Sequence, residues 1–257
     1  MYYIKMTDTK IQEVVAVVDR SGSMMGKEDD TLGGINSTFE LLKQEKDENT
    51  NIKVSVKLFD HEQTLLFRSI DLEEVRNITR DQYHPRGQTA LLDAMGDTLS
   101  HFMEKKLMDP NAYDSCVIYV VTDGKENNSK NYTYDKIKKL VEQAETAYNI
   151  KILYLGANQD AIQEASKYGI NPNQAMNYSE TTDTVDAAYR ACASVTRRVS
   201  TTGDASFLKA ERVASSSVSE PRRSTTMPPR VTRQINDLEQ TQHVEFLLPS
   251  RQRSFKQ

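Results

Sequence analysis

Short runs of apolar, β-branched residues alternate with amphipathic helical stretches over the first 202 residues of the chain. This alternation favours a sheet of mainly parallel strands with helices on both faces, because each parallel connection must cross over the sheet. The runs Val14–Val18 and Val117–Val121 are apolar at every position, as parallel strands buried on both faces are. The sequence therefore predicts a doubly wound, Rossmann-like α/β fold of three layers, α/β/α.

Six strands and five helices are expected from the two periodicities. The expected strands are Glu13–Val18, Ile52–Phe59, Thr64–Ile70, Cys116–Thr122, Ile150–Leu155 and, with a weaker pattern, Gln174–Tyr178. The expected helices are Thr31–Lys46, Ala90–Met108, Tyr134–Tyr148, Gln159–Tyr168 and Thr182–Val199. In Ile52–Phe59 apolar residues alternate with Lys and Ser, which predicts a more exposed strand than the others.

The composition changes near residue 202. Residues 203–257 hold nine basic and six acidic residues, and they are rich in Ser, Thr, Pro and Arg. Such a segment cannot bury enough apolar surface to offset the entropy lost on ordering. We expect residues 1–202 to form one domain and residues 203–257 to be a mostly disordered tail. Between Val231 and Leu248 a short amphipathic helix or docking peptide is an alternative to a loop.

Charge and cysteine content exclude several classes of protein. The formal net charge is −4, so there is no overall basic field of the kind that binds nucleic acid. Apolar runs such as Val14–Val18 are far shorter than the ~20 residues that span a bilayer. The start of the sequence lacks the pattern of a secretory leader, and two cysteines are too few for a disulfide framework. A cytoplasmic protein without a membrane partner is expected.

Oxygen-bearing side chains follow two of the expected strands and precede one helix. Asp19-Arg20-Ser21-Gly22-Ser23 follows the first strand, Asp123-Gly124 follows the fourth, and Gly87-Gln88-Thr89 precedes the helix Ala90–Met108. In a doubly wound sheet, ligands bind at the carboxyl ends of the strands where the strand order reverses. Carboxylate and hydroxyl oxygens suit Mg²⁺, Mn²⁺ or Ca²⁺ rather than zinc. With only two carboxylates, such a site leaves the cation positive enough to accept one more.

These residues resemble the metal-ion-dependent adhesion site (MIDAS) of the von Willebrand factor type A (VWFA) domain. The resemblance rests on Asp-x-Ser-x-Ser at 19–23, Thr89 in Gly-Gln-Thr-Ala-Leu and Asp123 in Val-Thr-Asp-Gly, and covers roughly residues 10–200. The stretch Leu155–Asp160 and the tail look more like the small microbial or viral members than like integrins.

The resemblance implies a set of metal ligands and a function. Ser21, Ser23 and Thr89 would bind the metal directly, and Asp19 and Asp123 would bind it directly or through water. The cofactor would be Mg²⁺ or Mn²⁺, with Mg²⁺ the first candidate. A carboxylate of a partner protein would complete the coordination, so the chain is expected to be a cation-dependent protein-binding module and not an enzyme. Arg20 and Lys125 flank the site and either steer an acidic partner or offset the negative charge.

The same residues also allow other interpretations. Ser and Asp at these positions could cap helices and form turns without a metal. The segment Gly22–Lys27 has one residue too few between its glycines for a phosphate-binding loop, and Glu28 stands where Ser or Thr is needed. A phosphate-handling enzyme is thus a remote alternative. A stronger one is an accessory or scaffold subunit that acts through its tail, on nucleic acid or an AAA+ ATPase, with a structural metal.

Overall fold

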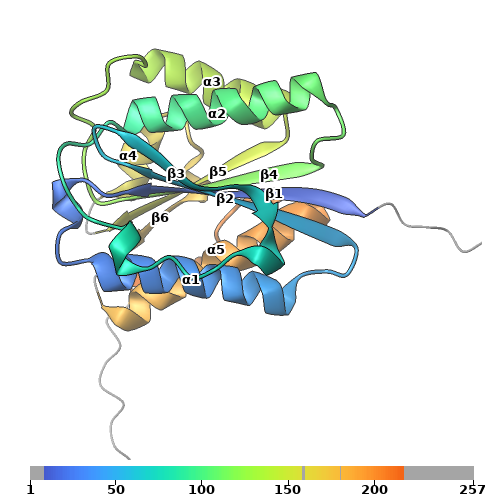
Figure 1. Ribbon diagram of the computed structural model, residues 1–257, viewed down its shortest axis with the longest axis horizontal. Coiled ribbons are helices and arrows are strands. Elements are labelled where there is room, and N and C mark those ends of the chain that lie inside the picture. Colours follow the sequence, from blue (N-terminus) through green and yellow to red (C-terminus); the bar gives the residue numbers. More distant parts are fainter. Residues whose placement is uncertain (1–8, 158–159, 180, 217–257) are drawn as a thin grey trace, which may run out of the picture. The chain divides into compact units, whose positions relative to one another are not determined.

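The computed structural model describes residues 9–157, 160–179 and 181–216. This part of the chain forms one mixed sheet with helices packed on both faces (Figure 1). The strands are β1 (Lys10–Asp19), β2 (Thr50–Phe59), β3 (Gln63–Asp71), β4 (Ser115–Thr122), β5 (Ile150–Ala157) and β6 (Ala175–Tyr178). The helices are α1 (Glu28–Glu45), α2 (Leu91–Met108), α3 (Tyr134–Ala147), α4 (Ala161–Lys167), α5 (Thr182–Thr202) and α6 (Lys209–Ser216).

The strand order is β3-β2-β1-β4-β5-β6, and every neighbouring pair is parallel except β2 and β3. The six strands and five helices expected from the sequence are all present, and the doubly wound α/β fold is confirmed. The order reverses between β1 and β4, because the chain builds outward from β1 to β3 on one side and from β4 to β6 on the other. The carboxyl ends of β1 and β4 are therefore the expected position of a ligand site.

Two apolar layers stabilise the sheet. On one face β-strand residues pack against α1 and α5, and on the other against α2, α3 and α4 (Figure 1). Val14, Val17 and Val18 of β1 are completely buried, which agrees with the continuous apolar run in the sequence. α1 begins three residues earlier than expected, because Glu28, Asp29 and Asp30 occupy its first turn, where acidic side chains interact favourably with the helix dipole.

The expectation that Ile52–Phe59 forms a more exposed strand than the others is wrong. β2 lies between β1 and β3 rather than in an exposed place, and most of its residues are buried. The alternation in its sequence has a different cause. Val54, Val56 and Leu58 face the layer of α1 and α5, whereas Ser55 and Lys57 face the opposite side and line a hollow beside α2.

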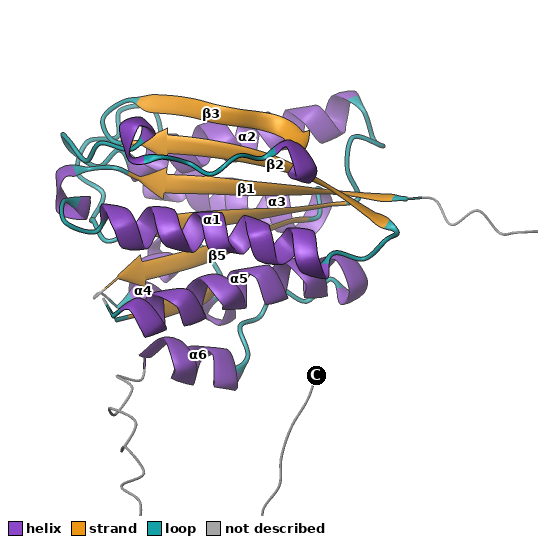
Figure 2. Ribbon diagram, turned by 60° about the horizontal axis from the view of Figure 1, so that its bottom comes forward, coloured by secondary structure: helices purple, strands orange, loops and turns teal. Residues whose placement is uncertain are grey.

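The packed part of the chain continues beyond residue 202, where a domain boundary was expected. α5 ends there, with Gly203 in the left-handed conformation as its cap, but Phe207 is only 5% exposed. Arg198 binds both carboxylate oxygens of Glu211 at 2.8 and 2.9 Å, and Ser215 donates a hydrogen bond to the carbonyl of Asn177. These contacts attach α6 to β6 and to α5, beside which it lies in Figure 2. The segment Val231–Leu248 lies outside the described residues.

These contacts predict that residues 203–216 contribute to stability. A chain that ends at Thr202 should unfold with a free energy about 2–4 kcal/mol lower than a chain that ends at Ser216, because it loses the buried side chain of Phe207 and several hydrogen bonds. Urea unfolding of the two truncated chains measures the difference. Equal stabilities would mean that the segment only rests on the surface.

Among the described helices, none combines the length and the apolar character needed to cross a membrane.

Candidate metal centre

Asp19 and Asp123 meet at the point where the strand order reverses. Asp19 is the last residue of β1, and Asp123 follows Thr122, the last residue of β4. The two strand ends are joined by a hydrogen bond of 2.6 Å from the hydroxyl of Thr122 to Oδ2 of Asp19. The sheet itself therefore places both carboxylates at one edge.

The loop after β1 turns back over Asp19. The backbone N–H of Ser21 donates to Oδ1 of Asp19 at 2.6 Å, which closes a turn of the kind that Asp favours. The hydroxyl oxygens of Ser21 and Ser23 lie 3.0 Å apart. Met24 is completely buried and fixes the end of the loop in the core. As a result both serine hydroxyls stay beside the Asp19 carboxylate.

Thr89 is held by the loop that carries Asp123. The backbone N–H of Thr89 donates to Oδ1 of Asn127 at 2.9 Å, and the backbone N–H groups of Asn127 and Asn128 donate to the carbonyl of Thr89 at 3.0 and 3.1 Å. The N–H of Gly22 donates to the carbonyl of Gly87 at 3.1 Å, which links the same segment to the first loop. Three loops that are far apart in sequence are thus locked together by their backbones.

The side-chain oxygens of the three loops converge beside Gly124. A Cβ atom on Gly124 would lie 2.9 Å from Oγ1 of Thr89, 3.1 Å from Oγ of Ser23 and 3.2 Å from Oδ2 of Asp19. The surface over this point is a depression of about 230 Å³, lined in part by Ser21, Ser23, Thr89 and Gly124. A carboxylate and hydroxyls around one point form a donor set that fits Mg²⁺ or Mn²⁺.

Asp123 is the fifth residue of the candidate site. Its side chain is only 4% exposed, and Oδ2 is ion-paired with the ammonium group of Lys27. Oδ1 is buried and has no hydrogen-bond partner among the described residues. A buried carboxylate oxygen without a donor is costly, so this atom fits a cation that the protein takes up. The structure therefore brings all five sequence-predicted residues together, although metal ligation by them stays a prediction.

Burial raises the pKa of Asp19 to about 6, although hydrogen bonds from Thr122 and Ser21 act in the opposite direction. The carboxylate is completely inaccessible to water. Removing a carboxylate from water disfavours its charged form, and a bound cation compensates for that loss.

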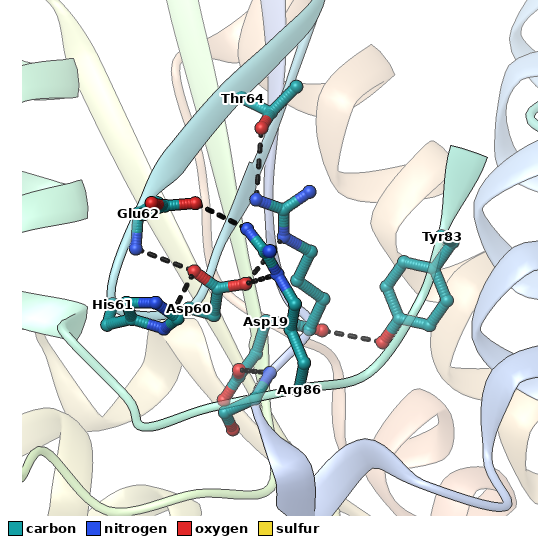
Figure 3. A network of polar contacts seen from close by, with 9 residues as sticks. Asp19, Asp60, His61, Glu62, Thr64, Tyr83 and Arg86 are labelled. Carbon is teal, nitrogen blue, oxygen red and sulfur yellow. Dashed lines mark hydrogen bonds and ion pairs between the residues drawn. The ribbon is translucent and has the colours of Figure 1, made fainter.

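A network of charges supports the loops beneath the site (Figure 3). Asp60, which follows β2 and is fully buried, accepts hydrogen bonds from Nε of Arg20 at 3.0 Å and from Nε of Arg86 at 2.9 Å. The hydroxyl of Tyr83 donates to the carbonyl of Asp19 at 2.6 Å. Arg20 thus points into the protein and binds Asp60, so of its two expected roles it offsets negative charge and does not steer a partner. Lys125 does line the depression.

Asp60, His61 and Glu62 also bring three possible metal-binding atoms within 4.8 Å of one another. Asp60 is already paired with Arg20 and Arg86, and Glu62 is paired with Arg86 at 2.5 Å. The carboxylates of this group are neutralised by arginine, so the group stabilises the loops and does not compete with the site at Gly124.

The match to a protein-family model decides the family. The model of the von Willebrand factor type A domain matches residues 13–189, which is more than half of the chain. The chain belongs to the von Willebrand factor type A domain family. The expected membership is confirmed, and the match includes Asp19, Thr89 and Asp123.

Solved structures with the same fold come from distant sources. Proximal thread matrix protein 1 of the mussel byssus is 14% identical, with 74% of this chain and 47% of that chain covered and a TM-score of 0.50. A von Willebrand factor type A protein of Catenulispora acidiphila is 13% identical (73% and 43% covered, TM-score 0.52). The pilus adhesin SpaC of Lactobacillus rhamnosus GG, in an open conformation, is 12% identical (74% and 30% covered, TM-score 0.55).

The chain spans less than half the length of each of these three proteins, and the likeness shows the fold alone. No curated protein matches the sequence.

Several residues that build the site were not identified from the sequence. The sequence pattern relates Lys27 only to a phosphate-binding loop. It assigns no role in the site to Glu126, Asn127 or Asp60. The position of Asp60 at the carboxyl end of a strand was the one available signal. Glu126 accepts backbone hydrogen bonds from Leu92, Asn128 and Ser129, which depends on a loop geometry that no spacing in the sequence encodes.

The ion pair between Lys27 and Asp123 leads to a prediction about metal affinity. The ammonium group neutralises a carboxylate that a divalent cation needs, so Lys27→Met should strengthen Mg²⁺ and Mn²⁺ binding by about tenfold, the value of a 1.4 kcal/mol contact. Calorimetric titration of wild type and variant measures the change. Lys125→Met, which removes a lysine that lines the depression, should change the affinity less. A loss of affinity in Lys27→Met would instead mean that Lys27 helps to hold the site.

Proposed function

We propose that this protein is a divalent-cation-dependent protein-binding module. The observation that carries the proposal is the convergence of Asp19, Ser23 and Thr89 on one point beside Gly124, next to the unpartnered oxygen of Asp123. Domains of this family generally act in protein interaction or adhesion. The oxygens gathered beside Gly124 support a metal-dependent form of that role. Mg²⁺ is the first candidate for the cation and Mn²⁺ the second. The cytoplasmic location, the small microbial or viral type and the absence of enzymatic activity belong to this proposal as predictions.

The hydroxyl and carboxylate ligands of the site would have different roles. The serine and threonine hydroxyls would hold the cation without adding negative charge, and Asp19 and Asp123 would supply the charge. When bound, the cation supplies a Lewis-acidic position that a carboxylate of a partner protein can occupy. The backbone hydrogen bonds among the three loops keep the oxygens in place before any ligand arrives, which lowers the cost of binding.

The scaffold alternative, in which the tail recruits a partner and the metal is structural, makes a different prediction. It places the interaction in the expected tail, residues 203–257, of which residues 217–257 lie outside the described structure. The contacts of the three loops give no specific support to that alternative, and they favour the metal site as the functional surface.

Thr89→Ala tests the proposed function. Thr89 is 3% exposed, and its backbone makes the contacts to Asn127 and Asn128, so loss of the hydroxyl should leave the fold unchanged. We expect cation affinity to fall at least tenfold, and partner proteins captured from a native extract in Mg²⁺ to be lost both in the variant and under chelation. Capture that persists in Thr89→Ala and under chelation, but is lost on removal of residues 217–257, would favour the scaffold.

A further inference from the structure

A second hollow, of about 240 Å³, lies between β2, β3 and α2, away from the three loops of the metal centre. β3 is an edge strand of the sheet, and α2 covers the sheet beside it (Figure 2). Val15, Leu65 and Phe102 form apolar parts of the wall. Leu65 is 40% exposed. The hollow is therefore an apolar surface that the protein leaves accessible.

Basic side chains line this hollow. Lys57 comes from β2, Arg68 from β3 and His101 from α2. Within the described part of the chain, neither Lys57 nor Arg68 has a carboxylate oxygen within 4.0 Å or a hydrogen-bond partner for its side chain. Arg20 and Arg86, by contrast, are both engaged by Asp60. In a chain of net charge −4, two unpaired cations around one apolar hollow mark a place for an anion.

A β-bulge brings Arg68 to the hollow. Lys57 pairs with Leu65, but Val56 pairs with Phe67, so β3 contains an extra residue at this point. In a regular strand Phe67 would follow Gln63 and Leu65 on the same face. The bulge turns Phe67 to the opposite apolar layer and leaves Arg68 beside Leu65. A second shift follows at Ser69, which has a φ of 45°. Bulges of this kind commonly re-aim a side chain at a functional site.

The electrostatic environment agrees with this assignment. Burial lowers the pKa of Lys57, the carboxylate of Asp97 raises it in part, and Arg68 lowers it by a smaller amount. Burial also lowers the pKa of His101, to which Arg68, Lys105 and Lys57 add, against a smaller effect of Glu104. Burial thus disfavours the charged forms of Lys57 and His101, Arg68 adds to that effect, and an anion in the hollow would offset it.

We propose that this hollow binds a small organic carboxylate whose apolar body is about the size of one or two rings. The carboxylate would lie against Arg68 and Lys57, and the body against Val15, Leu65 and Phe102. The size follows from the volume, because a cavity of about 150 Å³ accommodates benzene. Arg68 can bind both oxygens of a carboxylate, which a single lysine cannot do.

The test uses the full-length protein freed of metal on a chelating resin, so that no cation at Asp19 and Asp123 can bind the probe. The probe is 2-naphthoate, and its neutral counterpart is 2-naphthalenemethanol. Titration followed by NMR should show chemical-shift changes at His101 and at residues of β3. The dissociation constant should be ~1 mM, which follows from the binding free energy per atom that is typical of small ligands. The pKa of His101 should rise when the probe is bound. The neutral compound should bind at least tenfold more weakly.

Substitutions separate the hollow from general effects of charge. Arg68→Gln should weaken 2-naphthoate binding at least tenfold, and Leu65→Glu should abolish it by placing a carboxylate in the hollow. Arg76→Gln removes the same charge from an exposed position after β3 and should change binding less than twofold. Equal affinity for the neutral probe, shifts located elsewhere, or unchanged binding in Arg68→Gln would each overturn the proposal. Because the metal is absent, none of these results depends on the function proposed for Asp19 and Asp123.

Discussion

Asp19→Asn should raise the stability of the metal-free protein and abolish its response to Mg²⁺ and Mn²⁺. The wild-type carboxylate is buried, and its pKa of about 6 lies above the ordinary value of 3.8. At pH 7 this shift corresponds to at most about 3 kcal/mol of lost stability. Asn keeps the hydrogen bond from Ser21 and can donate to the hydroxyl of Thr122, which can turn to the carbonyl of Gly124 at 3.3 Å. The variant thus removes a charge and keeps the hydrogen bonds to Ser21 and Thr122.

The difference in stability between Asp19→Asn and wild type should depend on pH. A raised carboxyl pKa favours the folded state below about pH 3.8, and that contribution is lost as the pH rises through about 6. The advantage of Asp19→Asn should therefore be full at pH 7 and nearly disappear at pH 4. Urea unfolding at both pH values measures it, with Asp186→Asn as an exposed control expected to change stability by less than ~0.5 kcal/mol.

Added Mg²⁺ should stabilise the wild type in proportion to its binding, and should leave Asp19→Asn unchanged. A variant that is less stable than wild type at pH 7, or that is still stabilised by Mg²⁺, would show that Asp19 serves the fold rather than a cation. The expected exchange of stability for binding is common at functional sites.

Gly124→Ala should eliminate cation binding while the protein stays folded. The new methyl group would lie 2.9 Å from Oγ1 of Thr89 and 3.1 Å from Oγ of Ser23, so it would occupy the point on which the ligand oxygens converge. The backbone of Gly124 does not have a positive φ, so Ala is compatible with it. We expect at least a hundredfold loss of Mn²⁺ affinity by calorimetry. The accompanying loss of stability, from crowding against side-chain oxygens that can shift, should be about 1–2 kcal/mol.

Gly33→Ala is the matched control. Gly33 lies within α1, and beyond its neighbours in the helix backbone no atom lies within 4 Å of the position of its Cβ. Ala should stabilise that helix by about 1 kcal/mol and leave metal affinity unchanged. If Gly124→Ala binds Mn²⁺ as tightly as Gly33→Ala does, the oxygens beside Gly124 are not the metal ligands.

The sequence alone was sufficient to determine the fold class and the residue types of the candidate centre. Local periodicity specifies which segments are strands and helices, and a parallel sheet forces the residues that follow β1 and β4 to the same edge. Asp19, Ser21, Ser23, Thr89 and Asp123 could therefore be assembled without coordinates. Their chemistry, hard oxygens with little negative charge, is a property of the residues themselves.

Only the tertiary structure decided what surrounds those residues. The ion pair of Lys27 with Asp123 and the direction of Arg20 toward Asp60 join segments that are far apart in the chain. The bulge that leaves Arg68 beside Leu65 arises from the register between β2 and β3. The attachment of Glu211 to Arg198 likewise carries the packed structure past residue 202, although the composition there resembles a tail. Periodicity describes how one segment distributes its apolar residues, whereas a charged side chain takes the direction set by its partner. That partner is known only once the strands and helices are packed together.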